Sequence, residues 1–388
     1  MDKRKRIFLV AGEHSGDSLG AALMGSLNQG LEPAPLYEGV GGALMEEEGL
    51  HSLFPLKDVA VMGLGAIISR LPTLTKRVYQ TVDAAVAFSP DIVVIIDSPE
   101  FTHPIAKRIR KKIPDVPIID YVSPSVWAWR PGRAKKMSFY VDHVLALLPF
   151  EPDAHKRLGG PACTYVGHSL VEKKQVIDVC SPADLQAELS ISSDAKKIVV
   201  LPGSRPNEVK RLMEPFGKAI EILREQHGDL EILIPVMPSV EALVEEQISD
   251  WPVKPHMLRG EEQKFAAFNL ADAALAASGT VTLELGLTKV PMVVAYRMGT
   301  TEYSLRRLVT VHSIVLANLV LGENIFPEFL QENCTPENLA AALQDLLSDT
   351  PALRAQKEGL ELVEKKIMLE DSTPSLEAAK IVQSYLKD

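Results

Sequence analysis

Short apolar runs alternate with longer amphipathic segments along the whole chain, and this alternation restricts the fold more than any other feature. A short apolar run is typical of a strand that is buried on both faces, and apolar residues spaced three to four apart indicate a helix. Chains in which strands and helices alternate form mainly parallel sheets. We therefore predict an α/β fold with strands at Ile7–Ala11, Leu36–Val40, Ile92–Asp97, Pro117–Val122, Val144–Leu148, Ile198–Pro202, Glu231–Pro235, Ala273–Ala277 and Pro291–Tyr296.

The chain is long enough for two domains, because its 388 residues exceed the ~300 at which a single hydrophobic core stops growing. The polar, weakly periodic segment Ser169–Asp194 separates two halves that each have the pattern of a doubly wound sheet, so we place the domain boundary there. The predicted helices are Asp17–Asn28, Leu74–Phe88, His103–Lys112, Gly132–Phe139, Pro206–Gln226, Lys264–Leu270, Thr282–Gly286, Pro336–Leu347, Ala352–Met368 and Pro374–Leu386.

The composition excludes several classes of protein. The longest stretch without Asp, Glu, Lys or Arg, Leu308–Gly322, is shorter than the ~20 apolar residues that cross a bilayer. No signal-peptide pattern follows Met1, so we expect a cytoplasmic protein without a transmembrane anchor. Cys163, Cys180 and Cys334 form no Cys-x-x-Cys pair, and no His/Cys cluster or Asp-x-Asp sequence has the spacing of metal ligands. We expect reduced thiols and no metal.

The formal net charge of -10 argues against nucleic acid as a partner. The charge is unevenly divided along the chain. Through His168 there are 19 Lys and Arg against 18 Asp and Glu, and from Ser169 onward there are 22 against 33. The N-terminal half can therefore approach an anionic surface that the C-terminal half would avoid.

The first predicted strand is followed by Gly12-Glu-His-Ser-Gly-Asp17, whose glycines permit a tight turn before a helix. A phosphate or a sugar fits such a turn. The glycines at 12, 16 and 20 do not have the Gly-x-Gly-x-x-Gly spacing of dinucleotide-binding turns. Ser15 and Asp17 can equally be helix caps, whereas Glu13 has no such simple role and is a candidate for a substrate contact.

Asp97 ends a nearly pure apolar strand and is followed by Ser98-Pro-Glu-Phe101. A carboxylate at the carboxyl end of a buried strand points into the ligand cleft of a parallel sheet, where partial desolvation raises its basicity. Asp97 is therefore the candidate general base. The alternative is a cap of the helix or turn that follows.

Two of the three tryptophans lie in the segment Tyr121–Arg130, directly after the next predicted strand. Trp127 and Arg130, beside serines, suit an amphipathic ligand such as a sugar that carries other groups. Ordinary packing of each tryptophan is the alternative. His168, at the end of the first half, is either a contact across the cleft or a structural histidine.

Two glycine-containing turns in the second half indicate a nucleoside diphosphate. In Leu201-Pro-Gly-Ser-Arg205, which precedes a long helix, the Ser204 backbone and the Arg205 fork suit phosphate oxygens. In Ala277-Ser-Gly-Thr280 the hydroxyl of Thr280 faces phosphate, and Glu284 one turn later can accept both hydroxyls of a ribose. Helix capping explains either turn alone.

The segment Val59–Ser69 and the residues after it combine long apolar side chains with flanking cations. If it is exposed, it lies in a membrane interface, with the cations of residues 107–112 near anionic head groups. The alternative is a core helix with a solvated basic end.

The motifs above, with Val61-Met-Gly63 and Leu148-Pro-Phe-Glu151, closely resemble the lipid A disaccharide synthases, glycosyltransferase family 19, over essentially the whole chain. The most specific string is Ser123-Pro-Ser-Val-Trp-Ala-Trp-Arg130, while His14 departs from the small residue expected in many members. The resemblance implies a GT-B fold, in which two Rossmann-like, doubly wound parallel-sheet domains face each other across a cleft. It implies an acceptor and membrane-side domain at 1–170, a UDP-sugar domain at 171–365, and a C-terminal helix at 366–388 that crosses back to the first domain.

The resemblance also implies the reaction, which is an inverting transfer of 2,3-diacylglucosamine from UDP to the 6-hydroxyl of 2,3-diacylglucosamine 1-phosphate. The products are the β(1→6) disaccharide 1-phosphate of lipid A and UDP, and no cofactor is implied. Asp97 and Glu13 are then the catalytic residues. The implied substrate-binding residues are Ser15, Trp127, Arg130, His168, Ser204, Arg205, Thr280, Glu284, Tyr296, Arg297 and Asn318, and the implied membrane surface is Met62, Leu64, Ile67, Ile68, Leu71 and Leu74.

The same resemblance implies peripheral association with an anionic inner membrane surface, and a C-terminal segment that crosses between domains makes a homodimer by exchange conceivable. Two other functions use the same sheets, because a fold alone does not decide chemistry. An oxidoreductase or nucleotide-sugar epimerase is one, although the missing Gly-x-Gly-x-x-Gly argues against a nicotinamide cofactor. A regulatory module that binds UDP without turnover is the other.

Overall fold

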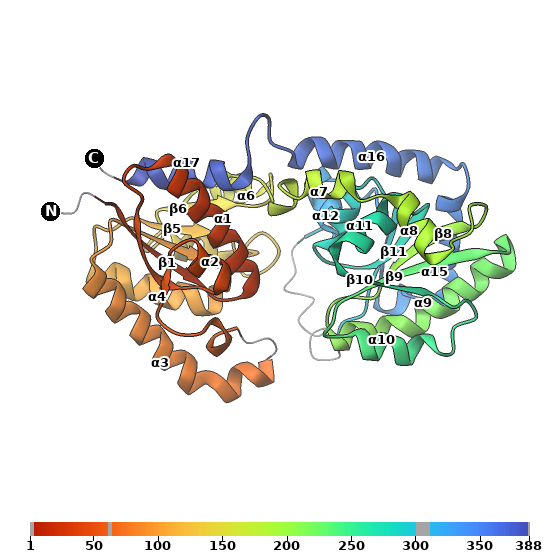
Figure 1. Ribbon diagram of the computed structural model, residues 1–388, viewed down its shortest axis with the longest axis horizontal. Coiled ribbons are helices and arrows are strands. Elements are labelled where there is room, and N and C mark those ends of the chain that lie inside the picture. Colours follow the sequence, from red (N-terminus) through yellow and green to blue (C-terminus); the bar gives the residue numbers. More distant parts are fainter. Residues whose placement is uncertain (1–3, 61–63, 300–310, 387–388) are drawn as a thin grey trace. The chain divides into compact units, whose positions relative to one another are not determined.

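The computed structural model describes residues 4–60, 64–299 and 311–386, without the side chains of residues 64–70. The chain divides into two compact units. The first comprises Met1–Glu172 and Leu369–Asp388, and the second comprises Lys173–Met368. Each unit is an α/β structure with its own parallel sheet, which confirms the predicted fold class (Figure 1).

The first unit is built on a seven-stranded sheet of order β3-β2-β1-β4-β5-β6-β7, in which every paired neighbour is parallel. Its strands are β1 (Arg6–Ala11), β2 (Leu36–Val40), β3 (His51–Ser52), β4 (Ile92–Ile96), β5 (Ile118–Tyr121), β6 (His143–Ala146) and β7 (Ala162–Tyr165). Its helices are α1 (His14–Gly30), α2 (Ala43–Glu47), α3 (Leu64–Phe88), α4 (Pro99–Lys112), α5 (Gly132–Met137), α6 (Glu151–Leu158) and α17 (Pro374–Tyr385), with the 3-10 turns η1 (Leu56–Asp58) and η2 (Ser169–Val171).

Alternate residues of the central strands enter two cores, one on each face of the sheet. Phe8 and Val10 of β1 pack in the core that α3, α4 and α5 cover, whereas Ile7 and Leu9 pack in the core that α1 and α17 cover. Strands covered on both faces are apolar throughout, because both sets of alternating side chains are buried. This is why β1 and β4 are apolar runs rather than alternating sequences.

The C-terminal helix α17 belongs to the first unit, although more than 200 residues separate it from β7. The backbone N–H of Ser375 donates to Glu172 at 2.8 Å, and the Tyr385 hydroxyl contacts His143 Nδ1 at 3.1 Å. Ala378, Ala379 and Val382 complete the core beside α1, and Figure 1 shows α17 lying along α1.

The second unit is built on a six-stranded sheet of order β10-β9-β8-β11-β12-β13, also parallel throughout. Its strands are β8 (Lys196–Leu201), β9 (Leu230–Val236), β10 (His256–Arg259), β11 (Ala273–Ala277), β12 (Met292–Tyr296) and β13 (Glu328–Leu330). Its helices are α7 (Lys174–Val179), α8 (Pro182–Leu189), α9 (Pro206–His227), α10 (Glu241–Ile248), α11 (Gly260–Leu270), α12 (Val281–Leu287), α14 (Leu316–Leu321), α15 (Pro336–Leu347) and α16 (Pro351–Ile367), with the 3-10 turn η4 (Gln331–Asn333).

The buried amide of Gln356 ties α16 to β12 in this unit. Its Oε1 accepts from the backbone N–H of Met292 at 2.7 Å, and its Nε2 donates to the Met292 carbonyl at 3.0 Å. Both polar atoms of the side chain are thereby satisfied inside the core, as buried polar groups require. On the other face of the sheet, α9, α10 and α15 share a core with β8 and β9.

All nine predicted strands are present, but four further strands were missed, namely β3, β7, β10 and β13. The helices α1, α3, α4 and α11 begin several residues earlier than predicted. In the described parts of the chain, we find no helix whose length and hydropathy would let it cross a bilayer.

Candidate active site

The turns after β1, β4 and β5 lie side by side at the carboxyl edge of the first sheet. Ala11 pairs with Ile96 and Ile96 pairs with Tyr121, all in parallel register. The residues that follow these three strands therefore begin at the same level of the sheet. This edge is where ligands bind in open parallel sheets.

Asp97 is the first residue after β4, and its backbone is strained. Its φ is 53° and that of Ser98 is 43°, so two consecutive non-glycine residues are in the left-handed region. Such conformations cost roughly 1–3 kcal/mol each and are retained where the surroundings fix them. Here the Asp97 N–H donates to the Tyr121 carbonyl at 2.9 Å, and Thr102 Oγ1 donates to the Asp97 carbonyl at 2.7 Å.

The carboxyl group of Asp97 is half-buried and accepts two hydrogen bonds. The Ser98 N–H donates to Oδ1 at 2.7 Å, and the Ser15 hydroxyl donates to Oδ2 at 3.2 Å. Burial raises the pKa of Asp97, and the charges of Glu13 and Asp120 also raise it, against the lowering effect of the two hydrogen bonds. A carboxylate with a raised pKa is a stronger base than an ordinary aspartate.

Glu13 is linked to the same turn through Ser98, whose hydroxyl donates to Glu13 Oε1 at 2.7 Å. Gly12 makes this approach possible, because a Cβ at that position would lie 2.3 Å from the Ser98 Cβ. Glu13 occupies the N-cap position of α1 without a side-chain cap bond. Its carboxylate is therefore directed at the turn after β4 rather than at its own helix.

Ser15 and Asp17, for which helix capping was the alternative, have different partners. Asp17 is buried and does cap a helix, but the helix is α2: its carboxylate accepts from the backbone N–H groups of Gly42, Leu44 and Met45 at 2.7–3.2 Å. Ser15 contacts Asp97 instead. Asp17 is thus structural, and Ser15 remains a candidate site residue.

A cavity of about 730 Å³ adjoins this turn. Its volume is in the range of small-molecule sites, which are mostly apolar with a few polar groups. The polar groups of its lining include Glu13, Ser98 and Glu100. Most of the rest of its described lining is apolar or cationic and comes largely from α3, α4 and the turn after β5: Val59, Leu71, Leu74, Val78, Phe101, Pro104, Arg108, Trp129 and Arg130.

Of the two tryptophans after β5, Trp129 is the one that lines the cavity, together with Arg130. The Arg130 guanidinium lies 4.1 Å from the centre of the Trp129 ring, a cation–π contact. Arg130 thus lines the cavity, and the ligand contact expected of it stays a prediction. Trp129 was not singled out, although its position next to Arg130 was a usable signal.

Trp127 does not line the cavity and has the packing role that was left open as the alternative. Its Nε1–H donates to Glu151 Oε1 at 2.9 Å, and its ring meets that of Phe150 edge to face at 5.1 Å. Its polar end is directed at α6. The substrate contact expected of Trp127 stays a prediction.

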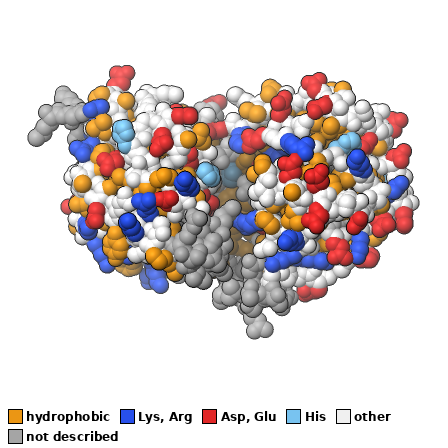
Figure 2. Space-filling model, turned by 60° about the horizontal axis from the view of Figure 1, so that its bottom comes forward, with side chains coloured by type: hydrophobic (Ala, Val, Ile, Leu, Met, Phe, Trp, Pro, Cys, Tyr) orange, Lys and Arg blue, Asp and Glu red, His pale blue; other side chains and the backbone are white. Residues whose placement is uncertain are grey.

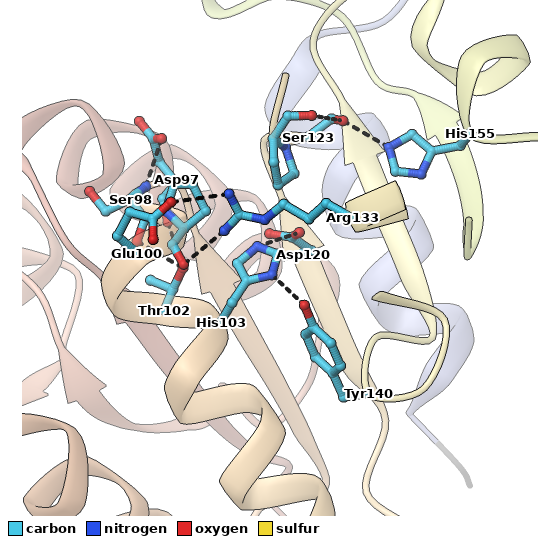
Figure 3. Close-up of polar contacts among 12 residues, drawn as sticks. Asp97, Ser98, Glu100, Thr102, His103, Asp120, Ser123, Arg133, Tyr140 and His155 are labelled. Atoms are coloured by element: carbon cyan, nitrogen blue, oxygen red, sulfur yellow. Dashed lines mark hydrogen bonds and ion pairs between the residues drawn. The ribbon is translucent and has the colours of Figure 1, made fainter. Parts of the chain in front are cut away.

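Buried histidines that the sequence analysis did not identify hold β5 and the turn after it (Figure 3). His103 of α4 contacts the Tyr140 hydroxyl at 2.9 Å and an Asp120 carboxylate oxygen at 3.2 Å. His155 of α6 contacts the Ser123 hydroxyl at 2.8 Å. All five side chains are buried. No short spacing in the sequence connects these residues, so only the fold reveals them.

His168 makes a local hydrogen bond in the first unit, and the substrate contact expected of it stays a prediction. Its Nδ1 accepts from the Leu170 N–H at 3.2 Å as the N-cap of η2. Desolvation lowers the pKa of His168 to about 4, so the imidazole is neutral at pH 7. It is not among the residues that line the cavity.

The predicted membrane surface lies partly outside the described residues. Met62 and the side chains of Leu64, Ile67 and Ile68 are not described. Leu71 is half exposed and Leu74 is half buried, and both line the cavity. Figure 2 shows Lys and Arg side chains beside hydrophobic ones on the first unit, and α4 ends in Arg110, Lys111 and Lys112.

In the second unit, Ser204 and Arg205 form the predicted turn before α9, with Gly203 at a φ of 111°. The turn binds an anion, but the anion is the chain's own Glu208. Its Oε2 accepts from the Ser204 and Arg205 N–H groups at 3.2 and 3.3 Å. These amides are therefore not free. The exposed Arg205 guanidinium also contacts Glu208, with Nη1 3.3 Å from Oε1, and its other N–H groups are the ones that a ligand phosphate would meet.

Thr280 and Glu284 lie at the start of α12, as the sequence indicated. Thr280 is exposed at the N-cap position. Glu284 is mostly buried and paired with Lys264 of α11, whose Nζ lies 3.0 and 2.9 Å from its two carboxylate oxygens. Lys264 neutralises and orients the carboxylate, and a carboxylate oxygen retains a free lone pair for a hydroxyl donor.

The last three predicted residues of this unit differ in their surroundings. Tyr296 and Arg297 are half-buried at the carboxyl end of β12, and Arg297 donates to the Cys334 carbonyl. Asn318 is fully buried: its Nδ2 donates to the Ser313 hydroxyl and to the Phe326 carbonyl, and its Oδ1 accepts two backbone N–H groups. Asn318 therefore organises residues 313–326, and the substrate contact expected of it stays a prediction.

Among the described residues, no group of three or more His, Cys, Asp and Glu side chains is arranged to hold a metal ion.

Comparisons with known proteins bear on the whole chain. The family model described as "Lipid-A-disaccharide synthetase" matches residues 7–382. A "Lipid-A-disaccharide synthase" of Nitrobacter hamburgensis is 48% identical over 379 residues, which is 97% of this chain and 95% of the relative. One of Bradyrhizobium diazoefficiens is 48% identical over 387 residues, which is 100% of this chain and 98% of the relative.

Solved structures with the same fold are far more distant in sequence. The Staphylococcus aureus MnaA–UDP structure matches with a TM-score of 0.66 at 15% identity, covering 98% of this chain and 97% of that one. UDP-GlcNAc 2-epimerase of Neisseria meningitidis bound to UDP-GlcNAc matches with a TM-score of 0.63 at 13% identity, with 98% and 99% coverage. MurG of Acinetobacter baumannii matches with a TM-score of 0.59 at 14% identity, with the same coverage. At such identities the likeness shows the GT-B fold alone.

Proposed function

The chain belongs to the lipid-A-disaccharide synthetase family, and from that premise we propose how its residues carry out the transfer. The chain is a UDP-sugar-dependent glycosyltransferase of lipid A biosynthesis. The full proposed reaction passes 2,3-diacylglucosamine from UDP to the 6-hydroxyl of 2,3-diacylglucosamine 1-phosphate with inversion. The family relationship favours transfer over epimerisation and over UDP binding without turnover. The relatives named as synthases are 48% identical to this chain, whereas the Neisseria epimerase that shares the fold is 13% identical.

Asp97 is the general base of this proposal. In an inverting transfer, the acceptor O6–H gives its proton to the base, O6 forms the bond to the anomeric carbon, and the bond from that carbon to the UDP oxygen breaks with its electron pair leaving on UDP. This requires one base and no enzyme nucleophile. The observation that supports Asp97 most is its raised pKa in a strained turn whose neighbours line an amphipathic cavity. Glu13 acts through Ser98 and by its charge on Asp97.

The cavity beside this turn is the proposed place of the acylated acceptor. Its apolar lining from α3 and α4 suits acyl chains, and its cations, Arg108 and Arg130, suit the 1-phosphate. The second unit is proposed to bind UDP. Arg205 contacts the diphosphate, Ser204, Thr280 and Tyr296 border it, and Glu284 accepts from the ribose hydroxyls, while Arg297 and Asn318 fix the surrounding loop.

Peripheral membrane binding is part of the proposal, because both substrates carry acyl chains. The supporting features are the half-exposed Leu71, the exposed Tyr79 on the same helix, and the basic end of α4. The proposal also includes a homodimer. Only a short segment joins α17 to α16, so the α17 of a second copy could pack on the first unit in place of the chain's own α17.

We expect the purified chain to release UDP when it is given UDP-2,3-diacylglucosamine and 2,3-diacylglucosamine 1-phosphate together, and not with either alone. Addition of a chelator should leave the rate unchanged, because the proposed charges come from side chains. UDP release and the disaccharide are measured by coupled assay and mass spectrometry. Release of free sugar without disaccharide, or loss of the rate with chelator, would contradict the proposal.

Asp97→Asn should keep UDP affinity and lower kcat by ~10²-fold or more, the usual scale for a positioned base. The base must be ionised, so kcat/KM should fall as pH drops through the raised pKa of Asp97. Glu13→Gln removes a charge that raises this pKa, so the acid limb should move to lower pH. Rate profiles of the three proteins across pH measure this. An acid limb that stays in place in Glu13→Gln would remove Glu13 from this role.

Arg205→Ala should weaken UDP binding by ~10-fold or more, because a charge-assisted contact to phosphate is lost. Isothermal titration with UDP measures the affinity. Lys218→Ala is the matched control, since Lys218 is an exposed cation of the same helix, α9, paired with Glu214. Equal UDP affinity of the Arg205 and Lys218 variants would place the diphosphate elsewhere.

Leu71→Ser combined with Tyr79→Ser should reduce sedimentation with phosphatidylglycerol vesicles, and high salt should reduce that of the unmodified chain. Leu44→Ser is the control, because Leu44 is similarly exposed in the same unit but lies on α2. Circular dichroism checks that the variants are folded. Vesicle binding by a folded double variant equal to that of the control would refute a membrane surface at α3.

A further inference from the structure

The turn between β5 and α5 carries Trp129 and Arg130 to the cavity, and its backbone is strained at both ends. Val122 has a φ of 84° and Arg130 one of 54°. A β-branched residue at positive φ is an outlier that persists only where the surroundings impose it. Something outside the turn must therefore hold it in this conformation.

Helix α6 holds the turn at two points. Glu151, the first residue of α6, accepts from Trp127 Nε1 at 2.9 Å with Oε1 and from the Leu148 N–H at 3.0 Å with Oε2. His155, one helical turn later, contacts the Ser123 hydroxyl at 2.8 Å (Figure 3). Residues four apart lie on one face of a helix, so both contacts come from the same face.

We propose that Glu151 is a positioning residue for the transfer: through Trp127 it fixes the turn that presents Trp129 and Arg130 to the acceptor cavity. It touches no substrate itself, since it is buried and is not part of the cavity lining. This role of Glu151 extends the proposed function and depends on it for the identity of the acceptor. Nothing in the proposed chemistry otherwise uses this buried acid.

The hydrogen-bond partners of Glu151, which are Trp127 and the backbone of Leu148 and Leu147, are all N–H donors, so the ionised carboxylate satisfies them together. The protonated acid has a hydroxyl on one oxygen and therefore turns a donor toward one of these N–H groups. Desolvation by burial raises the pKa of Glu151 to about 7, against the lowering effect of its hydrogen bonds. Proton uptake near neutral pH would thus loosen the hold on Trp127.

Four titratable groups face Glu151 from α6 itself and the neighbouring elements, namely Asp120, His155, Cys163 and Tyr165. Asp120 of β5 adds negative charge that raises the pKa of Glu151. Burial and Glu151 itself raise the pKa of Cys163 and of Tyr165, both of β7, so the thiol and the phenol are neutral. Desolvation lowers the pKa of His155, which is neutral as well at pH 7.

Glu151→Gln reproduces the protonated acid at every pH, because its amide also has one acceptor and one donor end. We expect it to raise the acceptor KM by ~10-fold at pH 8, with a smaller change in kcat. Displacement of a positioning group by ~1 Å can reduce rates up to 10²-fold, and here the displaced groups are those that would contact the acceptor. The KM of the unmodified chain should rise as pH falls below about 7 and approach the flat value of Glu151→Gln. UDP affinity should not change.

Trp127→Phe removes the donor and should raise the acceptor KM to a similar extent. The double variant with Glu151→Gln should lose no more than either single variant, because the two changes remove the same hydrogen bond. Tyr37→Phe is the matched control for loss of a buried hydrogen bond in the same unit, on β2, which β1 and β4 separate from β5. It should lower stability without changing KM.

An NMR titration, which needs no turnover, tests the role of Glu151 independently of the proposed function. In protein labelled with ¹⁵N-tryptophan, the Trp127 indole resonance should shift with a midpoint near pH 7, and this titration should be absent in Glu151→Gln. The titration together with absent transfer would overturn the proposed function but leave Glu151 as the holder of the turn. An unmoved indole resonance, or a pH-dependent KM that persists in Glu151→Gln, would overturn the inference.

Discussion

The parallel register of β1, β4, β5 and β6 is the constraint on which the first unit's site depends. Ala11 lies beside Ile96, Ile96 beside Tyr121, and Tyr121 beside Leu145, so four turns leave the sheet at one level. Hydrogen-bonded parallel strands are about 4.8 Å apart, which is close enough for side chains of successive turns to touch. Each turn then restrains the next: Ser98 donates to Glu13, the Asp97 N–H donates to β5, and Trp127 donates to Glu151. The chemistry of Asp97 therefore depends on residues from four separate parts of the chain.

The strands that sequence reasoning found and those it missed differ in one physical respect. Apart from β2, which contains Glu38 and Gly39, the nine predicted strands are mostly apolar runs, and all nine lie between two neighbouring strands of their sheets. The four missed strands, β3, β7, β10 and β13, are the four sheet edges. They have two to four residues and few buried side chains, as in the sequence Ala162-Cys-Thr-Tyr165, so no hydrophobic period marks them. An edge strand is specified by the neighbour it pairs with rather than by its own composition.

The candidate site was predictable to the extent that strand ends place residues. Asp97, Glu13, Arg130, Arg205 and Glu284 follow strands, and the fold puts each at the carboxyl edge of a sheet. The direction of a side chain was not predictable, because it depends on a partner distant in sequence. Trp127 donates to Glu151, the Asn318 amide bonds to residues 313–326, and Glu208 accepts from the backbone N–H groups of the turn at Ser204. Composition and spacing contain no information on these pairings.

The two turns beside the cavity contain several strained backbone positions. Of the nine non-glycine residues with positive φ in the described chain, Asp97, Ser98, Val122 and Arg130 belong to the two turns beside it. At roughly 1–3 kcal/mol each, these conformations remove stability that the packed sheet must supply.

The burial of Glu151 also lowers the stability of the fold, by an amount that depends on pH. The pKa of Glu151 is about 4.5 when unfolded and about 7 when folded, so the folded state holds the proton more tightly, and stability falls as pH rises between these values. The loss is on the order of 3 kcal/mol above pH 7, where the carboxylate is ionised. An apolar residue would avoid this loss, but it would leave the Trp127 and Leu148 N–H groups without an acceptor, and the turn would be free to relax. The unfavourable burial of Glu151 and the strained backbone of the turn are thus two parts of one arrangement, in which stability is given up to fix Trp129 and Arg130 at the cavity.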